Sequence, residues 1–379
     1  MKFIDRALLK VLEKRLIPNK VVILLGARRV GKTELINHYL AQLPKENYLQ
    51  LNGDDVKDIE LLAERSVSNY QRLLNNISLL VIDEAQNIPE IGLILKLIVD
   101  SVDNIKVIAT GSSMFDLGQK LGEPLVGRSF VIKLYSFAQL ELNKYENYKI
   151  TNEHLEERLI FGSYPELEQY KDWKQKQLYL NEIINSYLLK DILVFERIKK
   201  SDKLYDLLKL IAYQIGKEVS IQEIGNSLGL GKNTVERYLD LLSKVFVIYK
   251  LPGYSKNLRK EITKSSRWYF YDNGVRNAII GNFNTISSRN DIGELWENYL
   301  LSERIKYNEY NEKYVKKYFW RTYDQQEIDL LEENNGVLNA FEFKWNKKKK
   351  VRIPGAFKKA YPEAGFKIIN PNNYLEWIS

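Results

Sequence analysis

Residues 21–33 read Val21-Val22-Ile23-Leu24-Leu25-Gly26-Ala27-Arg28-Arg29-Val30-Gly31-Lys32-Thr33. An apolar run is followed by the spacing G-x-x-x-x-G-K-T and then by a helical pattern that extends to Leu40. This order predicts a buried strand, a phosphate-binding loop and a helix. The two glycines permit a tight turn in which backbone N–H groups point at an anion, at the positive end of the helix. We expect Lys32 to reach the β- and γ-phosphates and Thr33 to offer its hydroxyl to Mg²⁺.

The predicted nucleotide-binding residues make up the whole loop and the start of its helix. They are Gly26, Ala27, Arg28, Arg29, Val30, Gly31, Lys32, Thr33 and Glu34. The alternative is an ordinary strand, turn and helix that carry these residue types by chance. Because every fixed position of the motif is met in the required context, the phosphate loop is favoured.

A second apolar run, residues 79–82, ends in Asp83 and Glu84. At the carboxyl end of a central strand, the first acid of such a pair holds Mg²⁺ and the second polarises the attacking water. We therefore assign Asp83 to magnesium and Glu84 to the catalytic base. A buried strand capped by solvated acids is the alternative, and the phosphate loop upstream argues against it.

A third apolar run, residues 105–109, leads into Thr110-Gly111-Ser112-Ser113. Ser112 or Ser113 is predicted to sense the γ-phosphate and the water, although either serine would also serve as a helix cap. Arg128 follows Gly127, and we expect it to contact phosphate in cis or in trans. A solvated loop arginine is the alternative there.

Length and composition set limits on the class of protein. A chain of 379 residues is too long for a single hydrophobic core, so two or three domains are expected. A composition of 45% hydrophobic and 28% charged residues is ordinary for a soluble protein. The absence of cysteine excludes disulfides and thiolate sites and is typical of a reducing cytoplasm, and two histidines exclude three-histidine metal sites. No run approaches the roughly 20 apolar residues of a membrane span, and the first residues do not resemble a signal peptide. The net charge of +8 is compatible with a nucleic-acid partner.

The order of helical and strand-like patterns predicts four domains. These are an ATPase core over 1–140, a helical lid over 141–200, a winged helix-turn-helix over 201–290 and a nuclease-like domain over 291–379. Within the core, helix-like sequence extends from Asp58 to about Asn75. In the lid, Arg197 is either a second phosphate sensor or part of a surface ion pair.

The predicted winged helix-turn-helix rests on three helical patterns followed by two strands. Ser220 and Glu223 form a capping box at the start of the second helix, and Gly229-Leu230-Gly231 makes the turn. Four residues at the start of the third helix are the expected DNA contacts: Lys232, Asn233, Thr234 and Arg237. The alternative is a module that only packs beside the ATPase.

The last segment contains acids and a lysine that converge when its strands are paired. A hairpin around the turn Asn334-Asn335-Gly336 puts Asp329 opposite residues 340–342, and Glu342 and Lys344 share a face of their strand. With Glu297 from the preceding helix, these carboxylates are expected to hold Mg²⁺, while Lys344 orients water or offsets phosphate charge. This spacing resembles the PD-(D/E)xK nuclease core. An exposed hairpin with a salt bridge is the alternative.

Over nearly its full length, the chain resembles a widespread prokaryotic family of AAA-type ATPases with a C-terminal domain of unknown function. The resemblance is carried by G-A-R-R-V-G-K-T at 26–33, V-I-D-E-A-Q at 81–86, T-G-S-S at 110–113, G-R at 127–128, G-S-Y-P-E at 162–166, Y-F-Y-D-N-G at 269–274, G-E-L-W-E-N at 293–298, W-R at 320–321, E-I-D at 327–329 and E-F-K at 342–344. It implies ATP binding and the domain order ATPase, winged helix, nuclease-like domain.

The sequence therefore predicts an α/β protein: a P-loop AAA-type ATPase core with a helical lid, a winged helix-turn-helix and an α/β restriction-nuclease-like domain. Its expected cofactors are ATP and Mg²⁺, its expected partners are DNA and further copies of the chain, and its expected location is cytoplasmic, without a membrane. The expected activity is ATP hydrolysis coupled to action on DNA, with an ATP-regulated nuclease. The alternative is a nucleotide-dependent switch that binds a protein partner and cuts nothing.

Overall fold

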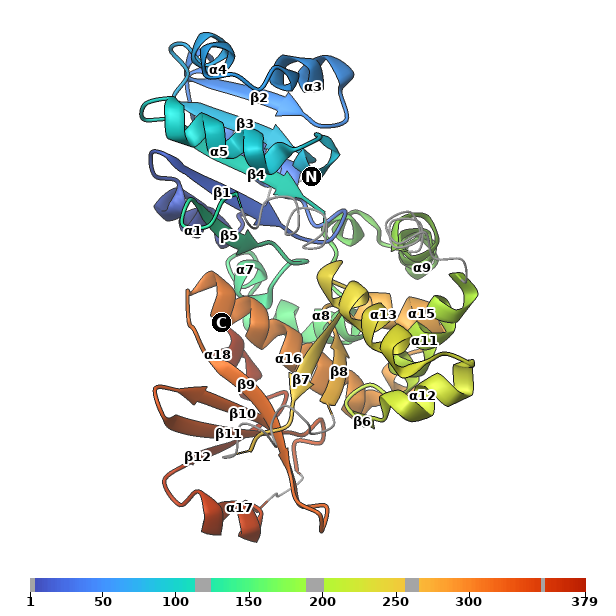
Figure 1. The fold of residues 1–379 in the computed structure, drawn as a ribbon. Coiled ribbons are helices and arrows are strands. Elements are labelled where there is room, and N and C mark those ends of the chain that lie inside the picture. The colour runs from blue at the N-terminus through green and yellow to red at the C-terminus, as the bar shows by residue number, and fades with distance from the viewer. Residues whose placement is uncertain (1–3, 113–123, 189–200, 256–265, 349–351) are drawn as a thin grey trace. The chain divides into compact units, whose positions relative to one another are not determined.

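The computed structural model describes residues 4–112, 124–188, 201–255, 266–348 and 352–379 (Figure 1). The chain divides into two compact units. The first unit comprises residues up to 136 together with 244–246, and the second unit comprises residues 137–243 and 247–379. The first boundary lies close to the predicted end of the ATPase core, and the finer division into four domains stays a prediction.

The first unit alternates helices with strands. Its elements are α1 (Leu8–Arg15), β1 (Lys20–Leu25), α2 (Lys32–Leu40), η1 (Lys45–Asn47), β2 (Tyr48–Asn52), α3 (Val56–Ala63), α4 (Val67–Leu73), β3 (Leu79–Asp83), η2 (Ala85–Asn87), α5 (Ile91–Ser101), β4 (Lys106–Gly111) and β5 (Ser129–Lys133).

The five strands of the first unit form one parallel sheet in the order β2-β3-β4-β1-β5. Helix α5 runs across one face of this sheet (Figure 1). Strands β1, β3 and β4 are buried almost throughout, which explains their continuous apolar sequences. Because the strands are parallel, the segments that follow β1, β3 and β4 meet at one edge of the sheet.

The helix-like stretch predicted from Asp58 to about Asn75 forms two separate helices, α3 and α4. Ser66 begins α4 by accepting a hydrogen bond from the backbone N–H of Asn69 at 3.2 Å. A serine at this position stabilises a new helix start because its side chain satisfies a free N–H group. Tyr70 is fully buried and donates to the carbonyl of Leu62, which joins the two helices.

The second unit contains two small sheets among helices. Its elements are α7 (Gln139–Leu142), α8 (Tyr148–Phe161), η3 (Pro165–Gln169), α9 (Trp173–Glu182), the π-helix η4 (Ile183–Leu188), α11 (Ser201–Tyr213), β6 (Glu218–Val219), α12 (Ile221–Leu228), α13 (Lys232–Lys244), β7 (Ile248–Pro252), β8 (Ser266–Phe270), α15 (Asn273–Ile280), η5 (Ile286–Ser288), α16 (Ile292–Tyr310), β9 (Lys316–Arg321), β10 (Glu327–Asn334), β11 (Val337–Phe343), α17 (Gly355–Ala360), β12 (Gly365–Ile369) and α18 (Tyr374–Ile378).

The two sheets of the second unit are connected by backbone pairing. Strands β6, β8 and β7 form an antiparallel sheet in that order, and the other sheet has the order β12-β11-β10-β9. Just after β7, Gly253 pairs with Phe319 of β9, and the N–H of Tyr254 donates to the carbonyl of Phe319 at 2.7 Å. Residues on β8 are therefore held near the C-terminal sheet.

The predicted hairpin around Asn334-Asn335-Gly336 is confirmed. Asn334 pairs with Val337, and the two residues between them, Asn335 and Gly336, both have positive φ, at 50° and 83°. Positive φ at both positions is the requirement of the tight turn that matches strand twist. On the other side of β10, the register to β9 shifts between Ile328 and Leu331, so a bulge contains Asp329.

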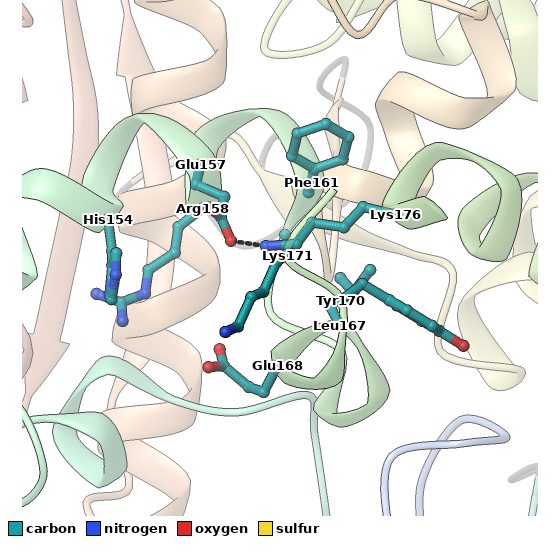
Figure 2. Close-up of a pocket in the computed structure, with 10 residues that line it drawn as sticks. His154, Glu157, Arg158, Phe161, Leu167, Glu168, Tyr170, Lys171 and Lys176 are labelled. Atoms are coloured by element: carbon teal, nitrogen blue, oxygen red, sulfur yellow. Dashed lines mark hydrogen bonds and ion pairs between the residues drawn. The ribbon is translucent and has the colours of Figure 1, made fainter. Parts of the chain in front are cut away.

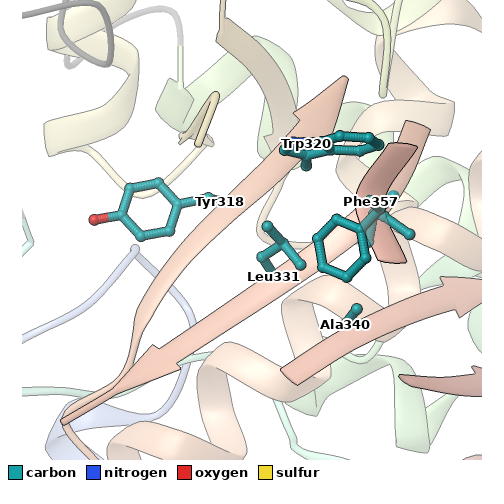
Figure 3. Close-up of a cluster of buried hydrophobic side chains, with 6 residues drawn as sticks. Tyr318, Trp320, Leu331, Ala340 and Phe357 are labelled. Atoms are coloured by element: carbon teal, nitrogen blue, oxygen red, sulfur yellow. The ribbon is translucent and has the colours of Figure 1, made fainter. Parts of the chain in front are cut away.

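A cluster of apolar side chains forms the core on one face of the C-terminal sheet (Figure 3). Its members are Tyr318, Trp320, Ile328, Leu331, Ala340 and Phe357. The rings of Trp320 and Phe357 meet edge to face at 5.1 Å, which fixes α17 against the sheet. This packing makes the strands that carry the C-terminal acids a rigid support.

Two of the quoted motifs meet in one buried hydrogen-bond network. The N–H of Ser163 donates to Asp272 at 2.9 Å, and a Cβ on Gly162 would lie 1.7 Å from the same carboxylate. Asn273 and Asn277 donate their amides to backbone carbonyls of α8. These contacts give the G-S-Y-P-E and Y-F-Y-D-N-G stretches a structural role. They provide hydrogen-bond partners for backbone groups that would otherwise be buried without one.

Candidate nucleotide and carboxylate–lysine sites

The predicted phosphate loop lies between β1 and α2. Gly31 has a φ of 92°, and a Cβ on Gly26 would lie 2.2 Å from the carbonyl oxygen of Leu134, so both positions need glycine. Lys32 is buried, and its Nζ donates to the carbonyls of Gly26 and Ala27 at 2.9 and 3.1 Å. The ammonium group is thus held over the loop, where the phosphates of a nucleotide would lie.

Asp83 at the end of β3 is brought to the phosphate loop. The Thr33 hydroxyl donates to Asp83 Oδ2 at 2.8 Å, although the two residues are 50 positions apart. Mg²⁺ is held in many sites by one or two protein oxygens, with waters and substrate phosphates filling its other positions. A hydroxyl and a carboxylate in contact form such a donor set, so these residues fit the cofactor that the sequence predicts.

Thr110 is a residue of this site that the sequence prediction missed. Its buried hydroxyl donates to the second oxygen of Asp83 and accepts the N–H of Glu84 at 3.0 Å. Ile82 pairs with Ala109, so Thr110 stands beside Asp83 in the sheet. Ser112 is buried two residues further on, and Ser113 and Arg197 lie outside the described residues.

Glu84 follows Asp83 in the left-handed conformation, with a φ of 47°. Its carboxylate accepts a hydrogen bond from the Gln86 amide at 2.5 Å. A Cβ on Gly53 would lie 2.3 Å from the Glu84 carbonyl, so the loop after β2 presses directly on the Glu84 backbone. An uncommon conformation held by its surroundings is a feature of functional sites, and it sets where the proposed base points.

Arg6 restrains the phosphate loop through hydrogen bonds, and no sequence motif indicated this role. The side chain is 5% exposed and donates to the carbonyl of Val30 at 2.7 Å and to that of Tyr135 at 2.6 Å. A guanidinium that bonds two carbonyls from distant segments restrains both. The loop is therefore tied to the last residues of the first unit.

Arg128 is not brought to the phosphate loop of its own unit. Strand β5 starts at Ser129, opposite Val21 near the start of β1, so Arg128 lies at the edge where strands begin. Its Nε donates to Asp100 at 2.7 Å. The phosphate loop follows the other end of β1, so only contact in trans remains as a prediction.

The predicted acids and lysine of the C-terminal sheet do come together. Lys344 Nζ lies 2.7 Å from Glu342 Oε2 and 3.5 Å from Asp329 Oδ2, and the N–H of Phe343 donates to Asp329 at 2.8 Å. The pairing of Leu330 with Phe341 continues to Asp329 opposite Glu342. Burial and the charge of Asp329 raise the pKa of Glu342 to about 7. We call Asp329, Glu342 and Lys344 the carboxylate–lysine site.

Glu297, the third predicted metal-binding carboxylate, is hydrogen-bonded to a tyrosine. Its Oε1 accepts the hydroxyl of Tyr269 at 2.5 Å. In the described part of the chain, no three Asp, Glu, His or Cys side chains form a group that could hold a metal ion, and the metal-binding role of Glu297 stays a prediction. Two carboxylates still suit Mg²⁺, which retains waters as its other ligands.

The predicted DNA contacts lie on one exposed stretch of α13. Lys232, Asn233 and Arg237 are exposed, and Thr234 is half-buried. Lys232 lies 3.8 Å from Glu236 one turn away, an exposed pair of small energetic effect. The helix is preceded by the left-handed Gly229, and its other face packs through Val235, as expected for an amphipathic helix.

A polar pocket of about 320 Å³ lies between α8, η3 and α9 (Figure 2). Lys176 is buried and paired with Glu157 across it. Arg158 is also buried, but its guanidinium bonds Gln139 and Glu146. Because its buried cations already have anionic partners, this pocket has no excess charge of one sign to select a ligand.

Three family models match the chain. Residues 18–143 match an AAA domain, residues 152–285 match the Domain of unknown function (DUF8612), and residues 292–376 match the Domain of unknown function (DUF4143). The first unit therefore contains an AAA-type P-loop domain, a class whose members bind and hydrolyse nucleotides. The C-terminal sheet and its carboxylate–lysine site lie within the third match.

Relatives extend over most of the chain. An uncharacterized protein of Mycobacterium tuberculosis is 25% identical over 329 residues, covering 86% of this chain and 70% of that protein. One of Haemophilus influenzae is 27% identical over 288 residues, 69% of each chain. Among solved structures, AMPPCP-bound DnaA from Aquifex aeolicus aligns with 62% of this chain and 86% of that chain, at 15% identity and a TM-score of 0.29. No helix in the described residues is long and apolar enough to cross a membrane.

Proposed function

We propose that the protein is a Mg²⁺-dependent ATPase that acts on DNA. The observation that carries the ATPase part is the 2.8 Å contact between Thr33 and Asp83, beside the phosphate loop. In this proposal, Lys32 neutralises the β- and γ-phosphates, Thr33 and Asp83 hold Mg²⁺, and Glu84 activates the water. Ser112 and Ser113 remain proposed sensors of the γ-phosphate.

ATP turnover tests these roles directly. Phosphate release is measured with Mg²⁺ for the wild type and for Glu84→Gln, which keeps the shape of the side chain but removes the base. We expect a loss of about 100-fold or more, the usual contribution of general base catalysis. Equal rates for the two proteins would mean that Glu84 is not the base.

The proposal that DNA is the partner is supported by the order of elements around α13. The element order α11, β6, α12, α13, β7 and β8 is compatible with the proposed winged helix-turn-helix, a motif whose third helix enters the major groove. Lys232, Asn233, Thr234 and Arg237 are the proposed contacts. Stimulation of ATP turnover by DNA favours this function over a switch that binds a protein partner.

A nuclease activity is proposed for the carboxylate–lysine site. When bound there, Mg²⁺ would polarise the phosphodiester and lower the pKa of a bound water. Asp329 and Glu342 would hold the ion, and Lys344 would orient the water or offset charge on the phosphate. The supporting observation is that the Lys344 ammonium lies within 3.5 Å of both acids.

DNA cleavage with Mg²⁺ and Mn²⁺ tests the nuclease proposal. We expect cleavage by the wild type, with and without ATP compared, and none by Asp329→Ala or Lys344→Ala. Cleavage that persists in either variant would overturn the assignment of this site. The competing function, a nucleotide switch that binds protein, predicts that ATP turnover is indifferent to DNA and that no preparation cuts it.

A further inference from the structure

Strand β8 directs two polar side chains at the helix that carries Glu297. Arg267 and Tyr269 are two positions apart and so lie on one face of the strand. The Tyr269 hydroxyl donates to Glu297 Oε1 at 2.5 Å, and an Arg267 nitrogen lies 3.9 Å from the same oxygen. Arg267 also bonds Glu327 at 2.7 Å, two residues before Asp329. Both side chains are buried, which is costly unless their polar groups are engaged.

Asn298 fixes the register between this strand and α16. Its amide oxygen accepts the N–H of Phe270 at 2.7 Å, and its nitrogen donates to the Phe270 carbonyl at 3.1 Å. The same nitrogen donates to Asn273 at 2.6 Å. An amide that bonds both backbone groups of one strand residue substitutes for a neighbouring strand. Glu297, one position earlier, is thereby held opposite Tyr269.

Glu297 and the carboxylate–lysine site share one buried region. Burial, followed by the negative charge of Asp329, raises the pKa of Glu297 to about 8. Three largely buried acids, Glu297, Asp329 and Glu342, pair with Arg267 or Lys344, and the exposed Glu327 also pairs with Arg267. Neighbouring carboxyl groups are ligands that a divalent cation prefers, and such a cation also offsets the charge of a phosphodiester.

We propose that Tyr269 and Arg267 are positioning residues of the carboxylate–lysine site, which therefore extends beyond residues 292–376 into strand β8. Tyr269 holds one oxygen of Glu297 and leaves the other for a water or cation next to Asp329. Arg267 spans Glu297 and Glu327 and limits their repulsion. The ligand class is a divalent cation with a nucleic-acid phosphodiester, so the proposal rests on the proposed nuclease function.

The chain offers a matched control for Tyr269. Tyr249 on β7 pairs with Tyr269, and the two rings stack with centroids 5.8 Å apart. The Tyr249 hydroxyl is buried and has no hydrogen-bond partner among the described residues. Tyr249→Phe and Tyr269→Phe therefore remove the same atom from the same stack, but only the second change releases Glu297.

The experiment measures Mn²⁺ binding to the full chain by calorimetry, and the Mn²⁺ concentration that gives half-maximal DNA cleavage. The difference between wild type and Asp329→Asn isolates binding at this site. We expect Tyr269→Phe to weaken that binding about 10-fold or more, as for other residues that orient a metal ligand, and Tyr249→Phe to leave it unchanged. Arg267→Lys is expected to retain more binding than Arg267→Met. Equal thermal midpoints exclude a general loss of structure.

Each outcome separates the two proposals. Wild-type binding by Tyr269→Phe would overturn the positioning role, and so would equal Mn²⁺ binding by wild type and Asp329→Asn. A wild type that binds Mn²⁺ in the expected order of variants but cuts no DNA would support positioning and overturn the nuclease function. A loss of maximal rate in Tyr269→Phe without a change in Mn²⁺ dependence would also count against the proposal.

Discussion

The hydroxyl of Thr110 links the two acids that the ATPase proposal depends on. It donates to Asp83 and accepts the N–H of Glu84, so it orients the magnesium ligand and fixes the start of the strained turn. Thr110→Val keeps the shape but leaves that N–H only its 3.2 Å hydrogen bond to Asp83 Oδ1. We expect Mg²⁺-dependent ATP turnover to fall about 10- to 100-fold, as for other residues that orient a metal ligand.

The control for this prediction is Thr110→Ser, which restores the hydroxyl without the methyl group. Turnover is measured against Mg²⁺ concentration, and we expect Thr110→Val to need more Mg²⁺ for half-maximal rate. Equal Mg²⁺ dependence in all three proteins would mean that Thr110 only fills space between the strands.

At the residue scale, sequence reasoning succeeds where a motif spans adjacent positions. The phosphate loop and Asp83 belong to runs in which neighbours in sequence are neighbours in space, and Thr33 and Asp83 are in contact. Thr110 was missed in favour of Ser112 and Ser113 because all three are hydroxyl residues near one strand end. Only the pairing of β3 with β4 determines which one stands beside Asp83.

The start of α16 depends on a buried cluster of charges. Asp291 accepts hydrogen bonds from Arg289 at 2.8 Å and from Arg276 at 2.5 Å, and both arginine side chains are buried. Asp291→Asn removes the negative charge and leaves the two cations without it. We expect the variant to lose about 3 kcal/mol of unfolding free energy at pH 7, because breaking a buried ion pair leaves a buried charge without its partner.

The pH dependence of this loss follows from the pKa of Asp291. Burial acts against ionisation, but hydrogen bonds from Arg289 and Arg276 outweigh it and lower the pKa. Its contribution is therefore full above the unfolded-state value of about 3.9 and is lost as the pH falls through the folded-state value. Urea unfolding of wild type and variant is expected to converge on acidification. The exposed Asp324→Asn serves as the control, and a constant difference at all pH values would contradict the prediction.

Helix α13 supplies a prediction about the DNA interface. Lys232→Ala with Arg237→Ala removes two exposed cations while Val235, on the other face, stays in place. If both bind phosphates, DNA affinity falls and the slope of log affinity against log salt becomes shallower by about 2. Fluorescence anisotropy over a salt series measures both quantities. The exposed pair Lys358 and Lys359, changed to alanine together, is the control, and an equal change of slope there would indicate non-specific attraction.

At the element scale, hydrophobic periodicity and turn residues predicted most of the helices, strands and turns that form. The hairpin at Asn335-Gly336 needed only two residues suited to positive φ. The break between α3 and α4 was missed because its signal is one serine cap inside a helical pattern. Helix α15 was missed because its start depends on Asp272, which accepts the N–H groups of Ser163, two residues after α8, and of Gly274 in its own first turn. A local sequence pattern does not reveal such long-range hydrogen-bond partners.

For the whole molecule, the two proposed sites belong to different compact units. Among the described residues, the proposed nucleotide contacts other than Arg128 in trans lie in the phosphate loop, at the start of α2 or just after β3 and β4. The carboxylate–lysine site lies on β10, on β11 and at the residue that follows β11. Each unit has its own sheet and core, so damage to one site leaves the other able to form. Lys32→Ala is therefore expected to abolish ATP turnover but to retain Mn²⁺ binding at Asp329, and Asp329→Asn is expected to do the reverse.

DNA cleavage then reports whether the units act together. If ATP controls the nuclease, both Lys32→Ala and Asp329→Asn cut no DNA in the presence of ATP, although each retains one intact site. If the sites are independent, Lys32→Ala cuts DNA as the wild type does, and ATP changes nothing. Loss of Mn²⁺ binding in Lys32→Ala would contradict the separation itself, because the folded state of the second unit would then depend on a residue of the phosphate loop. The three outcomes differ in Mn²⁺ binding and in DNA cleavage. Comparing the wild type with Lys32→Ala and Asp329→Asn therefore distinguishes ATP-controlled cleavage from two independent sites.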